Sequence, residues 1–332
     1  MNTQNRTAAV VVTYNRKELL RQSLTAILNQ EEYGADIIII DNASSDGTAD
    51  MVSKEFNLPQ IIYRNTGTNL GGAGGFQYGV REAMNAPKGY AYDYVWMMDD
   101  DTIPHDDCLK ELMEADRKLN GNWGWLSSVA YWTDGSVCRM NIQKKNIFRH
   151  IGSQEYKKKM VQIKMCSFVS LLVRADAIHK VGFPIGEYFI WTDDYEYTGR
   201  ISGKYPCYLV TGSKVIHAMK THIRVDFARD DISRMDRYHY IYRNDVHCYR
   251  QYGIMGWLYI ILKDIYTLLN IMKNSREGKL EKMKTVFSGF REGLRFRPKI
   301  ETCAEKEPGG GIGRSVLIRC TDDFVFFGEA AA

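Results

Sequence analysis

The chain has 332 residues, 45% of them hydrophobic, which is enough for one large domain with a full core. Its formal net charge of +4 is small for this length, so the overall charge does not indicate a nucleic-acid-binding protein. The 7 cysteines form no Cys-x-x-Cys pair, which argues against a zinc ribbon or a disulfide framework and fits a reducing compartment. The N-terminus lacks the basic segment and long apolar core of a signal peptide, and no stretch reaches the roughly 18 apolar residues of a spanning helix. We therefore expect neither export nor integration into a membrane.

Short β-branched runs alternate with helical patterns in the first part of the chain. Continuous apolar runs predict four strands, at residues 8–13, 36–41, 60–65 and 92–98. Helical spacing of apolar residues predicts helices between them, the first carrying Leu20 and Leu24, the others near residues 46–56 and 76–84. Asn15 and Glu18 have the spacing of a capping box that would open the first helix. Strands that are apolar on both faces and joined by helices predict an α/β fold with a mostly parallel sheet flanked by helices.

Polar residues follow each of these predicted strands. They are Thr13, Tyr14, Asn15 and Arg16 after the first strand, Asp41 and Asn42 after the second, residues 65–75 after the third, and Asp99, Asp100 and Asp101 after the fourth. The carboxyl ends of parallel strands meet at one edge of a sheet, where open α/β sheets bind their ligands. We therefore expect these four segments to form one ligand site.

The rest of the chain divides into three parts by composition. Residues 106–245 mix shorter strands and helices, and no Pro/Gly/Ser linker separates them from residues 1–105, so residues 1–245 are predicted to form one domain with two halves. Residues 246–298 form an amphipathic basic helical region, and residues 299–332 form a tail without a helical period.

The acidic run Asp99-Asp100-Asp101 is the strongest single signal. Two unit charges about 5 Å apart repel by roughly 3 kcal/mol at an effective dielectric near 20, so such a run requires water or a cation. Carboxylates at alternate positions past a strand end can bind one divalent metal, which in turn can hold the diphosphate of a nucleotide. The alternative is an acidic turn that caps the next helix, a role open to Asp106 or Asp107 as well.

Two other segments give weaker signals. Residues 41–52 resemble a calcium loop only superficially, because Ala43 and Ser45 stand at ligand positions and Val52 replaces the bidentate glutamate. Residues 69–76, NLGGAGGF, match neither the dinucleotide-binding nor the P-loop pattern. Their glycines would let the backbone approach a bulky ligand closely, although close packing of a helix on a strand explains them equally well.

The later part of the chain contributes a second acidic pair and a histidine. Asp193 and Asp194, in WTDDYEY, could include a general base, or one of them could cap a solvated helix. His217 ends the apolar run YLVTGSKVIH and could complete a metal site with carboxylates, or could be a structural histidine.

The order of these motifs resembles the inverting GT-A glycosyltransferases of family 2. VVTYNR, IIIIDNASSDGT, NLGGAGGF, WMMDDDTIP, WTDDYEY, GSKVIH and YRN at 242–244 follow one another as they do in that family, over residues 8–245. GGAGGF with a full DDD looks most like bacterial galactofuranosyltransferases, which use UDP-galactofuranose; rhamnosyltransferases and other hexosyltransferases of the family remain alternatives. The resemblance implies a GT-A fold and a role in making cell-surface polysaccharide, with a glycan or lipid-linked glycan as acceptor.

The resemblance also implies roles for individual residues. Asp99, Asp101 and His217 would hold Mn²⁺ or Mg²⁺, and Asp194 would be the catalytic base. The donor would be bound by Thr13, Tyr14, Arg16, Asp41, Asn69, Gly71, Gly72 and Asp100. Thr192 departs from the Trp that many galactofuranosyltransferases carry directly before the two acids, which leaves the acceptor pocket uncertain.

Further expectations concern the segments around this core. Residues 218–236 are predicted to form a flap that closes over the donor, with Arg224, Arg229 or Arg243 near phosphate. Residues 250–299 would dock on an anionic membrane from the cytoplasmic side, or would pack on the domain or on a second copy. Two other classes stay open: a nucleotidyltransferase, disfavoured because TYNRKELL lacks a glycine-rich basic loop, and a non-catalytic nucleotide-sugar binding module.

Overall fold

A computed structural model describes residues 6–87, 91–219, 226–231, 235–303 and 317–319 of the chain. Within these residues a nine-stranded sheet runs through the molecule in the order β3-β2-β1-β4-β8-β6-β9-β5, with β7 paired to β9. Its strands are β1 Thr7–Thr13, β2 Asp36–Asp41, β3 Ile61–Asn65, β4 Tyr94–Asp99, β5 Thr102–Pro104, β6 Trp125–Tyr131, β7 Met160–Gln162, β8 Leu171–Arg174 and β9 Tyr208–His217.

The four strands predicted from the sequence form the parallel half of this sheet. β1 pairs in parallel with β2 and β4, and β2 pairs in parallel with β3. The other half is mixed, because β8 is antiparallel to both of its neighbours while β6 and β9 are parallel. The sheet is therefore continuous from the first half of the chain into the second, and the predicted α/β fold class is confirmed.

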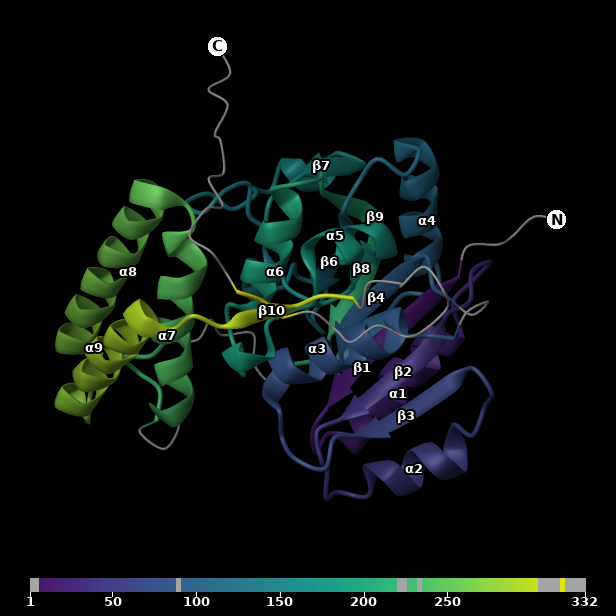
Figure 1. Cartoon of the computed structure of the whole chain (residues 1–332), viewed down its shortest axis with the longest axis horizontal. Helices are drawn as coiled ribbons and strands as arrows, with labels where there is room; N and C mark the ends of the chain where they lie inside the picture. Colours follow the sequence, from purple (N-terminus) through teal and green to yellow (C-terminus); the bar gives the residue numbers. More distant parts are fainter. Residues whose placement is uncertain (1–5, 88–90, 220–225, 232–234, 304–316, 320–332) are drawn as a thin grey trace, which may run out of the picture.

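Helices cover both faces of the sheet, as Figure 1 shows. Val11 of β1 and Ile39 of β2 point to one face, in a core shared with α1 Lys17–Leu28, α2 Thr48–Glu55 and α4 Cys108–Leu119. Val10 and Ile38 point to the other face, in a core shared with α3 Gly71–Met84, α5 Ala175–Val181 and α6 Asp193–Ser202. Both faces of these strands are buried, which is why their sequences are continuously apolar.

The predicted capping box at Asn15 and Glu18 was wrong. α1 begins at Lys17 after Arg16, which makes no side-chain cap. Asn15 has a φ of 53° and its amide oxygen accepts hydrogen bonds from Ser45, while the carboxylate of Asp46 accepts the Lys17 N–H at 2.9 Å. A loop after β2 therefore caps the helix, a tertiary contact that local spacing does not reveal.

A layer of three helices follows the sheet domain and confirms the predicted C-terminal helical extension (Figure 1). It consists of α7 Met235–Arg250, α8 Gly253–Asn274 and α9 Lys279–Arg295, followed by β10 Lys299–Glu301, which pairs antiparallel with β11 Leu317–Arg319. α8 is long and apolar enough, by length and composition, to cross a membrane, and 17% of its most apolar stretch is buried in the protein. The expectation that no stretch is long and apolar enough to span a membrane was therefore wrong. Lys263 and Asp264 interrupt the apolar run within α8, so a search for uninterrupted apolar stretches misses the helix.

Candidate active site

The acids of the DDD run lie where β4 ends and β5 begins. Asp99 is the last residue of β4, and Asp101 directly precedes Thr102, the first residue of β5. β5 is antiparallel to β9 with Thr102 opposite His217, and the Ala218 N–H donates to the Asp101 carbonyl at 2.8 Å. Strand pairing therefore brings a histidine from late in the chain beside an acid run from early in the chain.

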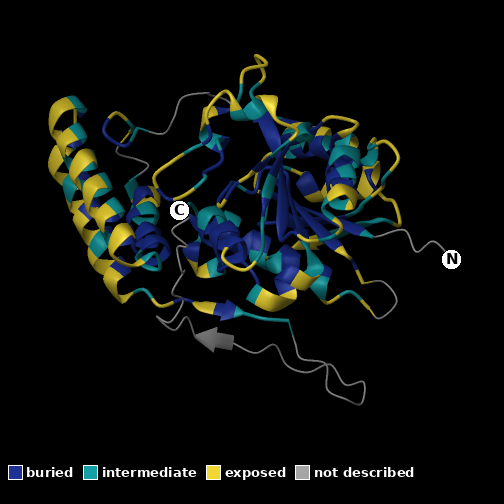
Figure 2. Cartoon of the chain, turned by 90° about the horizontal axis from the view of Figure 1, so that it is seen from above, coloured by how far each residue is buried: buried dark blue, intermediate teal, exposed yellow. Residues whose placement is uncertain are grey.

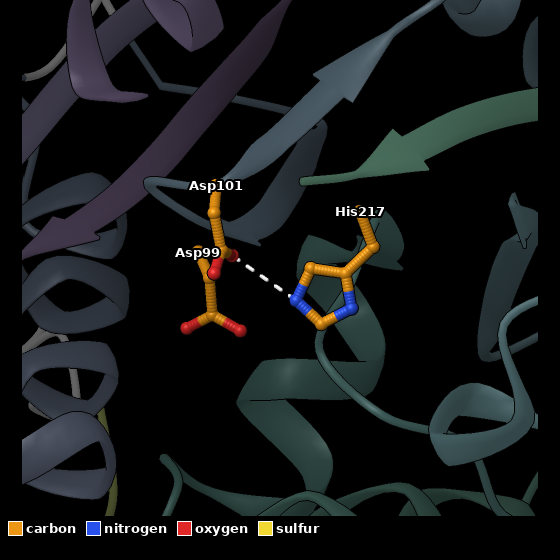
Figure 3. Close-up of side chains that lie close together, drawn as sticks. All are labelled: Asp99, Asp101 and His217. Carbon is orange, nitrogen blue, oxygen red and sulfur yellow. Dashed lines mark ion pairs between the residues drawn. The ribbon is translucent and has the colours of Figure 1, made fainter. Parts of the chain in front are cut away.

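Asp99, Asp101 and His217 form one cluster, shown in Figure 3. Each offers one ligand atom, and these atoms lie within 4.8 Å of one another. His217 Nε2 lies 3.0 Å from Asp101 Oδ1, yet this buried oxygen accepts no hydrogen bond. Two carboxylates and an imidazole around an unsatisfied buried oxygen fit the ligand set of Mn²⁺ or a similar divalent cation.

Asn141 orients the histidine, a role that sequence analysis does not predict. Its amide oxygen lies 2.8 Å from His217 Nδ1, and its amide nitrogen donates to Ser167 Oγ at 2.8 Å. An acceptor at Nδ1 keeps a proton there, so in the neutral ring that would bind a metal the lone pair is on Nε2, which faces the two carboxylates. Asn141 lies just before a basic segment and has no local pattern that marks it.

Burial and charge shift the pKa values of the cluster in opposite directions. Burial, with Asp101 and Asp100 nearby, raises the pKa of Asp99 to about 7. Burial alone would raise the pKa of Asp101, but His217 and Arg16 outweigh it and hold the pKa below its usual value. Burial alone would lower the pKa of His217, but Asp101 chiefly raises it to about 10. A divalent cation among these groups would relieve the repulsion that favours a proton on Asp99.

Asp100 connects the first strand end to this cluster. Thr13 Oγ1 donates to Asp100 Oδ2 at 2.8 Å, and Arg16 Nη1 lies 3.2 Å from Asp100 Oδ1 and 2.8 Å from Asp101 Oδ2. Burial raises the pKa of Asp100 to about 6, against the effect of Arg16. The structure thus brings together Thr13, Arg16 and the acids, as the sequence predicted for the ends of the first and fourth strands.

The second strand end carries Asp41, which is buried and already bonded. Its carboxylate accepts the Tyr63 hydroxyl at 2.5 Å and the Ser44 N–H at 2.8 Å. Tyr14, after the first strand, is 43% exposed and so open to a ligand. Asp41 helps to shape the loop of residues 42–48 in addition to any ligand contact.

The glycines of the NLGGAGGF segment are packed closely at some positions and open at another. Asn69 Oδ1 accepts the Gly71 N–H at 2.9 Å and turns the chain into α3. A Cβ at Gly71 would lie 2.1 Å from the Phe189 carbonyl oxygen, and one at Gly75 would lie 2.5 Å from a Val12 methyl, so both positions require close packing. A Cβ at Gly72 would meet nothing within 4 Å, which leaves this backbone accessible.

The second acidic pair opens α6, where Thr192 occupies the N-cap position. Neither aspartate is the cap of a solvated helix, because Asp193 is only 8% exposed and Asp194 is half-buried. Burial chiefly raises the pKa of Asp193 to about 8 and that of Asp194 to about 7. The charge of Asp99 contributes to the shift at Asp194, so the two clusters belong to one electrostatic neighbourhood.

The segment before α6 has an unusual backbone. Phe189, at φ 63° and ψ −58°, is the centre of a γ-turn of the rare positive-φ kind, closed by the Ile190 N–H and the Tyr188 carbonyl at 2.7 Å. Trp191 and Thr192 have φ values of 65° and 67°. Such conformations cost of order 1–3 kcal/mol for residues with side chains and persist only where the surroundings enforce them.

Three consecutive residues of α7 enforce this backbone. Asn244 Nδ2 donates to the carbonyls of residues 188, 190 and 191 at 2.9–3.0 Å. Arg243 donates to the carbonyls of residues 187 and 188, and the Thr192 hydroxyl donates to Asp245 at 2.8 Å. We call Arg243, Asn244 and Asp245 the α7 clamp. Arg243 therefore holds the loop rather than standing free for phosphate, and Arg224 of the predicted flap lies outside the described residues.

Lys144 is a second residue that the sequence did not single out. It is 3% exposed, its Nζ lies 3.1 Å from the Tyr249 hydroxyl, and it lies 4.2 Å from the centre of the Tyr195 ring. Burial lowers its pKa to about 8, and its charge lowers the pKa of Asp194. In the sequence it stands in the basic pair Lys144-Lys145, which is more typical of a solvated surface.

Known proteins share both the sequence pattern and the fold. Residues 8–182 match the family described as Glycosyl transferase family 2. Galactofuranosyltransferase GlfT1 of Mycobacterium tuberculosis is 38% identical over 199 residues, and its counterpart from Mycolicibacterium smegmatis is 26% identical over 199 residues. Each alignment covers 58% of this chain, and it spans only 63% and 64% of the lengths of these two relatives.

Two solved structures have a similar fold at low sequence identity. GalNAc-T7 with UDP, GalNAc and Mn²⁺ has a TM-score of 0.58 at 12% identity, covering 89% of this chain and 57% of that one. The mannosyltransferase PcManGT from Pyrobaculum calidifontis, in complex with GDP-Man and Mn²⁺, has a TM-score of 0.54 at 16% identity, covering 88% and 76%. These likenesses agree with the expected GT-A fold, and the family match spans more than half of the chain. The chain belongs to glycosyl transferase family 2.

Proposed function

We propose that this enzyme transfers galactofuranose from UDP-galactofuranose to a hydroxyl of a glycan or lipid-linked glycan, with inversion at the anomeric carbon. The observation that carries the proposal is the meeting of Asp99, Asp101 and His217 in one cluster that interacts electrostatically with Asp194. The choice of sugar is supported by the two GlfT1 relatives, which are galactofuranosyltransferases.

Asp99, Asp101 and His217 are the residues that would hold a divalent cation, Mn²⁺ or Mg²⁺. Two solved structures with a similar fold contain Mn²⁺, one together with UDP and GalNAc and the other together with GDP-Man. When bound, such a cation neutralises charge that develops on the diphosphate leaving group.

Residues at the strand ends would bind the donor. Arg16 places a guanidinium beside the acids and is half-exposed, so it can turn to the diphosphate. Tyr14 and the open backbone at Gly72 are accessible to the nucleoside. The remaining donor contacts are assigned to Thr13, Asp41, Asn69, Gly71 and Asp100.

Asp194 would act as the general base. Its carboxylate takes the proton of the acceptor hydroxyl, the hydroxyl oxygen forms a bond to the anomeric carbon, and the bond from that carbon to the diphosphate oxygen breaks. UDP leaves with the electron pair of the broken bond. Burial keeps the pKa of Asp194 near 7, where a carboxylate is a stronger base than in water.

The site of the reaction is proposed to be the cytoplasmic side of a membrane, where the enzyme would act as a peripheral protein on a lipid-linked acceptor. The six described cysteines are all free, which fits a reducing compartment.

A donor screen tests the proposal. The enzyme is incubated with UDP-galactofuranose, UDP-galactopyranose, UDP-GlcNAc, GDP-mannose and dTDP-rhamnose in the presence of Mn²⁺, and nucleotide release is followed with and without acceptor. We expect release chiefly from UDP-galactofuranose, and NMR of the product should show an inverted anomeric centre. Preference for dTDP-rhamnose would assign a rhamnosyltransferase instead, and retention of configuration would remove Asp194 from its role as base.

A further inference from the structure

The outer face of α8 is apolar from Ile254 to Met272 and is exposed (Figure 2). Its exposed side chains include Ile254 at 85%, Tyr266 at 71% and Leu269 at 59%. The other exposed apolar side chains are Met255, Leu258, Ile261, Leu262, Ile265 and Met272, and the exposed Lys273 follows them at the end of the helix. At the 3.6-residue period of a helix these positions lie opposite Gly256, Ile260 and Ile271, which are buried against the rest of the protein. A contiguous apolar face that extends over most of a 22-residue helix marks an interaction site.

The charges within this stretch of α8 are not on the outer face. Lys263 pairs with Asp245 of α7, and Asp264 follows it on the flank of the helix, where burial raises its pKa to about 7. A helix on the surface of a water-soluble domain has the opposite arrangement, with charges outward and apolar residues inward. The outer face of α8 is therefore built to meet an apolar medium.

Positive charge lies beside this face. Residues 273–299 contain nine Lys or Arg residues and three Glu residues, a net charge of +6, whereas the whole chain carries +4. On α9 the exposed side chains of Leu280, Phe287 and Leu294 accompany exposed cations. A shallow hollow of about 500 Å³ on α9 is lined by Lys284, Phe287, Ser288, Arg291, Glu292 and Arg295.

We propose that the outer face of α8 and the cationic face of α9 form one docking surface for an anionic lipid bilayer, with α8 lying in the plane of the interface. Apolar side chains of α8 would enter the acyl region, and Lys284, Arg291 and Arg295 would contact lipid headgroups. The inference rests on the proposed reaction at a membrane and assigns the surface that binds the membrane. Its main readout, vesicle binding, is independent of sugar transfer.

Two other occupants fit the observations less well. In a symmetric dimer through α8, the +6 segments of two copies would adjoin each other, and like charges disfavour that arrangement. A spanning α8 would have to leave α7, break the Lys263–Asp245 pair and place both Lys263 and Asp264 in the hydrocarbon core. Docking in the plane keeps every contact of the structure.

A chain of contacts links the docking surface to the proposed base. Lys263 of α8 pairs with Asp245, Asp245 accepts the Thr192 hydroxyl, and Thr192 is the N-cap of the helix that carries Asp194. A bilayer bound to α8 would therefore hold the active site at a fixed height and tilt above the headgroups.

Vesicle flotation of the full chain tests the charges of α9. Vesicles of phosphatidylcholine alone are compared with vesicles that also contain phosphatidylglycerol, at low and high salt. We expect the protein to bind only the vesicles that contain the anionic lipid. Each cation near an anionic surface contributes about 1 kcal/mol, so the removal of three cations should weaken vesicle binding about a hundredfold. The variant is Lys284→Ala, Arg291→Ala and Arg295→Ala; its matched control, with the same loss of charge elsewhere, is Lys54→Ala, Lys180→Ala and Lys214→Ala.

A second variant tests the apolar face, Ile261→Gln, Ile265→Gln and Leu269→Gln, with the exposed Leu58→Gln as control. We expect tight binding to be lost in the variant and retained in the control, while both release UDP from the donor at the wild-type rate without lipid.

Vesicle binding that does not depend on anionic lipid, or that neither triple variant weakens, would overturn the proposal. So would sedimentation showing a lipid-free dimer that the α8 variant dissociates, because this would make the face a seam between copies. Failure of UDP release with intact vesicle binding would count against the proposed reaction alone.

Discussion

The active site contains two pairs of aspartates, Asp99 with Asp101 and Asp193 with Asp194, whose surroundings differ. Asp101 lies beside Arg16 and His217, whose charges lower its pKa. Asp193 is buried and Asp194 is half-buried at the start of α6, and burial raises the pKa values of both. Asp99 resembles both: it belongs to the first cluster, yet burial and Asp101 raise its pKa.

The comparison shows that neighbours, rather than residue type, decide whether a carboxylate holds a cation or a proton. An imidazole, a guanidinium and an unsatisfied oxygen suit the first pair to a metal. Desolvation, with Lys144 as one nearby cation, suits Asp194 to accept a proton near neutral pH. Four experiments break or sharpen this distinction, in order of decreasing expected effect.

Replacing Asp194 by Asn should have the largest effect. Loss of the general base should lower kcat at least about a hundredfold and leave UDP and Mn²⁺ binding nearly unchanged. Asp193→Asn is the matched control: burial raises the pKa of Asp193 to about 8, so its carboxyl is mostly neutral at pH 7 and an amide should replace it with little loss. Steady-state kinetics and calorimetric UDP binding check both variants. Equal losses in the two variants would contradict separate roles for the two acids.

Replacing Asn244 by Ala removes the central residue of the α7 clamp. The two N–H groups of the amide, which three backbone carbonyls share, lose their bonds, and so does the amide oxygen that accepts Arg243 Nε. At about 1 kcal/mol for each of these three groups, the free energy of unfolding should fall by roughly 3 kcal/mol. Urea denaturation measures this, with the exposed Asn57→Ala as control. The residual folded enzyme should also lose turnover, since Asp194 follows the clamped loop. A variant as stable as the control would show that the loop holds its conformation without the clamp.

Asn141→Ala should weaken the metal site without removing a ligand. Loss of the group that fixes the His217 ring typically lowers metal affinity about 10–100-fold. Titration of Mn²⁺, followed by its electron paramagnetic resonance signal, measures the affinity, and kcat at saturating Mn²⁺ should approach the wild-type value. Asn122→Ala, on an exposed loop, is the control. Unchanged Mn²⁺ affinity would separate Asn141, and with it His217, from the metal.

The pH dependence of kcat should report the pKa of Asp194. A base with a raised pKa is active above that pKa, so activity should fall about tenfold per pH unit below about 7. Bound metal cancels the contribution of Asp99, but burial is the largest cause and keeps the pKa above its usual value. Lys144→Met removes a charge that lowers this pKa, so the profile should move to higher pH, unlike that of the exposed Lys158→Met. A shift in the acid direction would contradict the placement of Lys144 beside the base.

The sequence predicted the parts of the fold and site that local patterns encode. Four apolar runs became the parallel half of the sheet, and the acids at the end of the fourth run lie where the rule for open α/β sheets places a ligand. His217 could be paired with these acids because it also ends a strand, β9, which pairs with β5.

The features that sequence analysis missed depend on tertiary contacts. Asn141, Lys144 and the α7 clamp act through partners far along the chain, and each looks ordinary among its neighbours in sequence. The capping prediction at Asn15 failed for the same reason, because Asp46 supplies the acceptor from another loop. The YRN segment resembles a family motif, but that resemblance alone did not show that Asn244 bonds to three carbonyls.

The backbone before α6 limits how far this enzyme can be made more robust. Phe189, Trp191 and Thr192 adopt positive φ values that glycine adopts without strain, so glycine would relieve backbone strain there. Yet Phe189 stacks on Tyr240 with ring centres 5.0 Å apart, Trp191 lies 5.1 Å from Tyr238, and Thr192 bonds to Asp245. A gain in melting temperature at these positions would loosen the support of Asp194, which makes this segment a place where durability and turnover oppose each other.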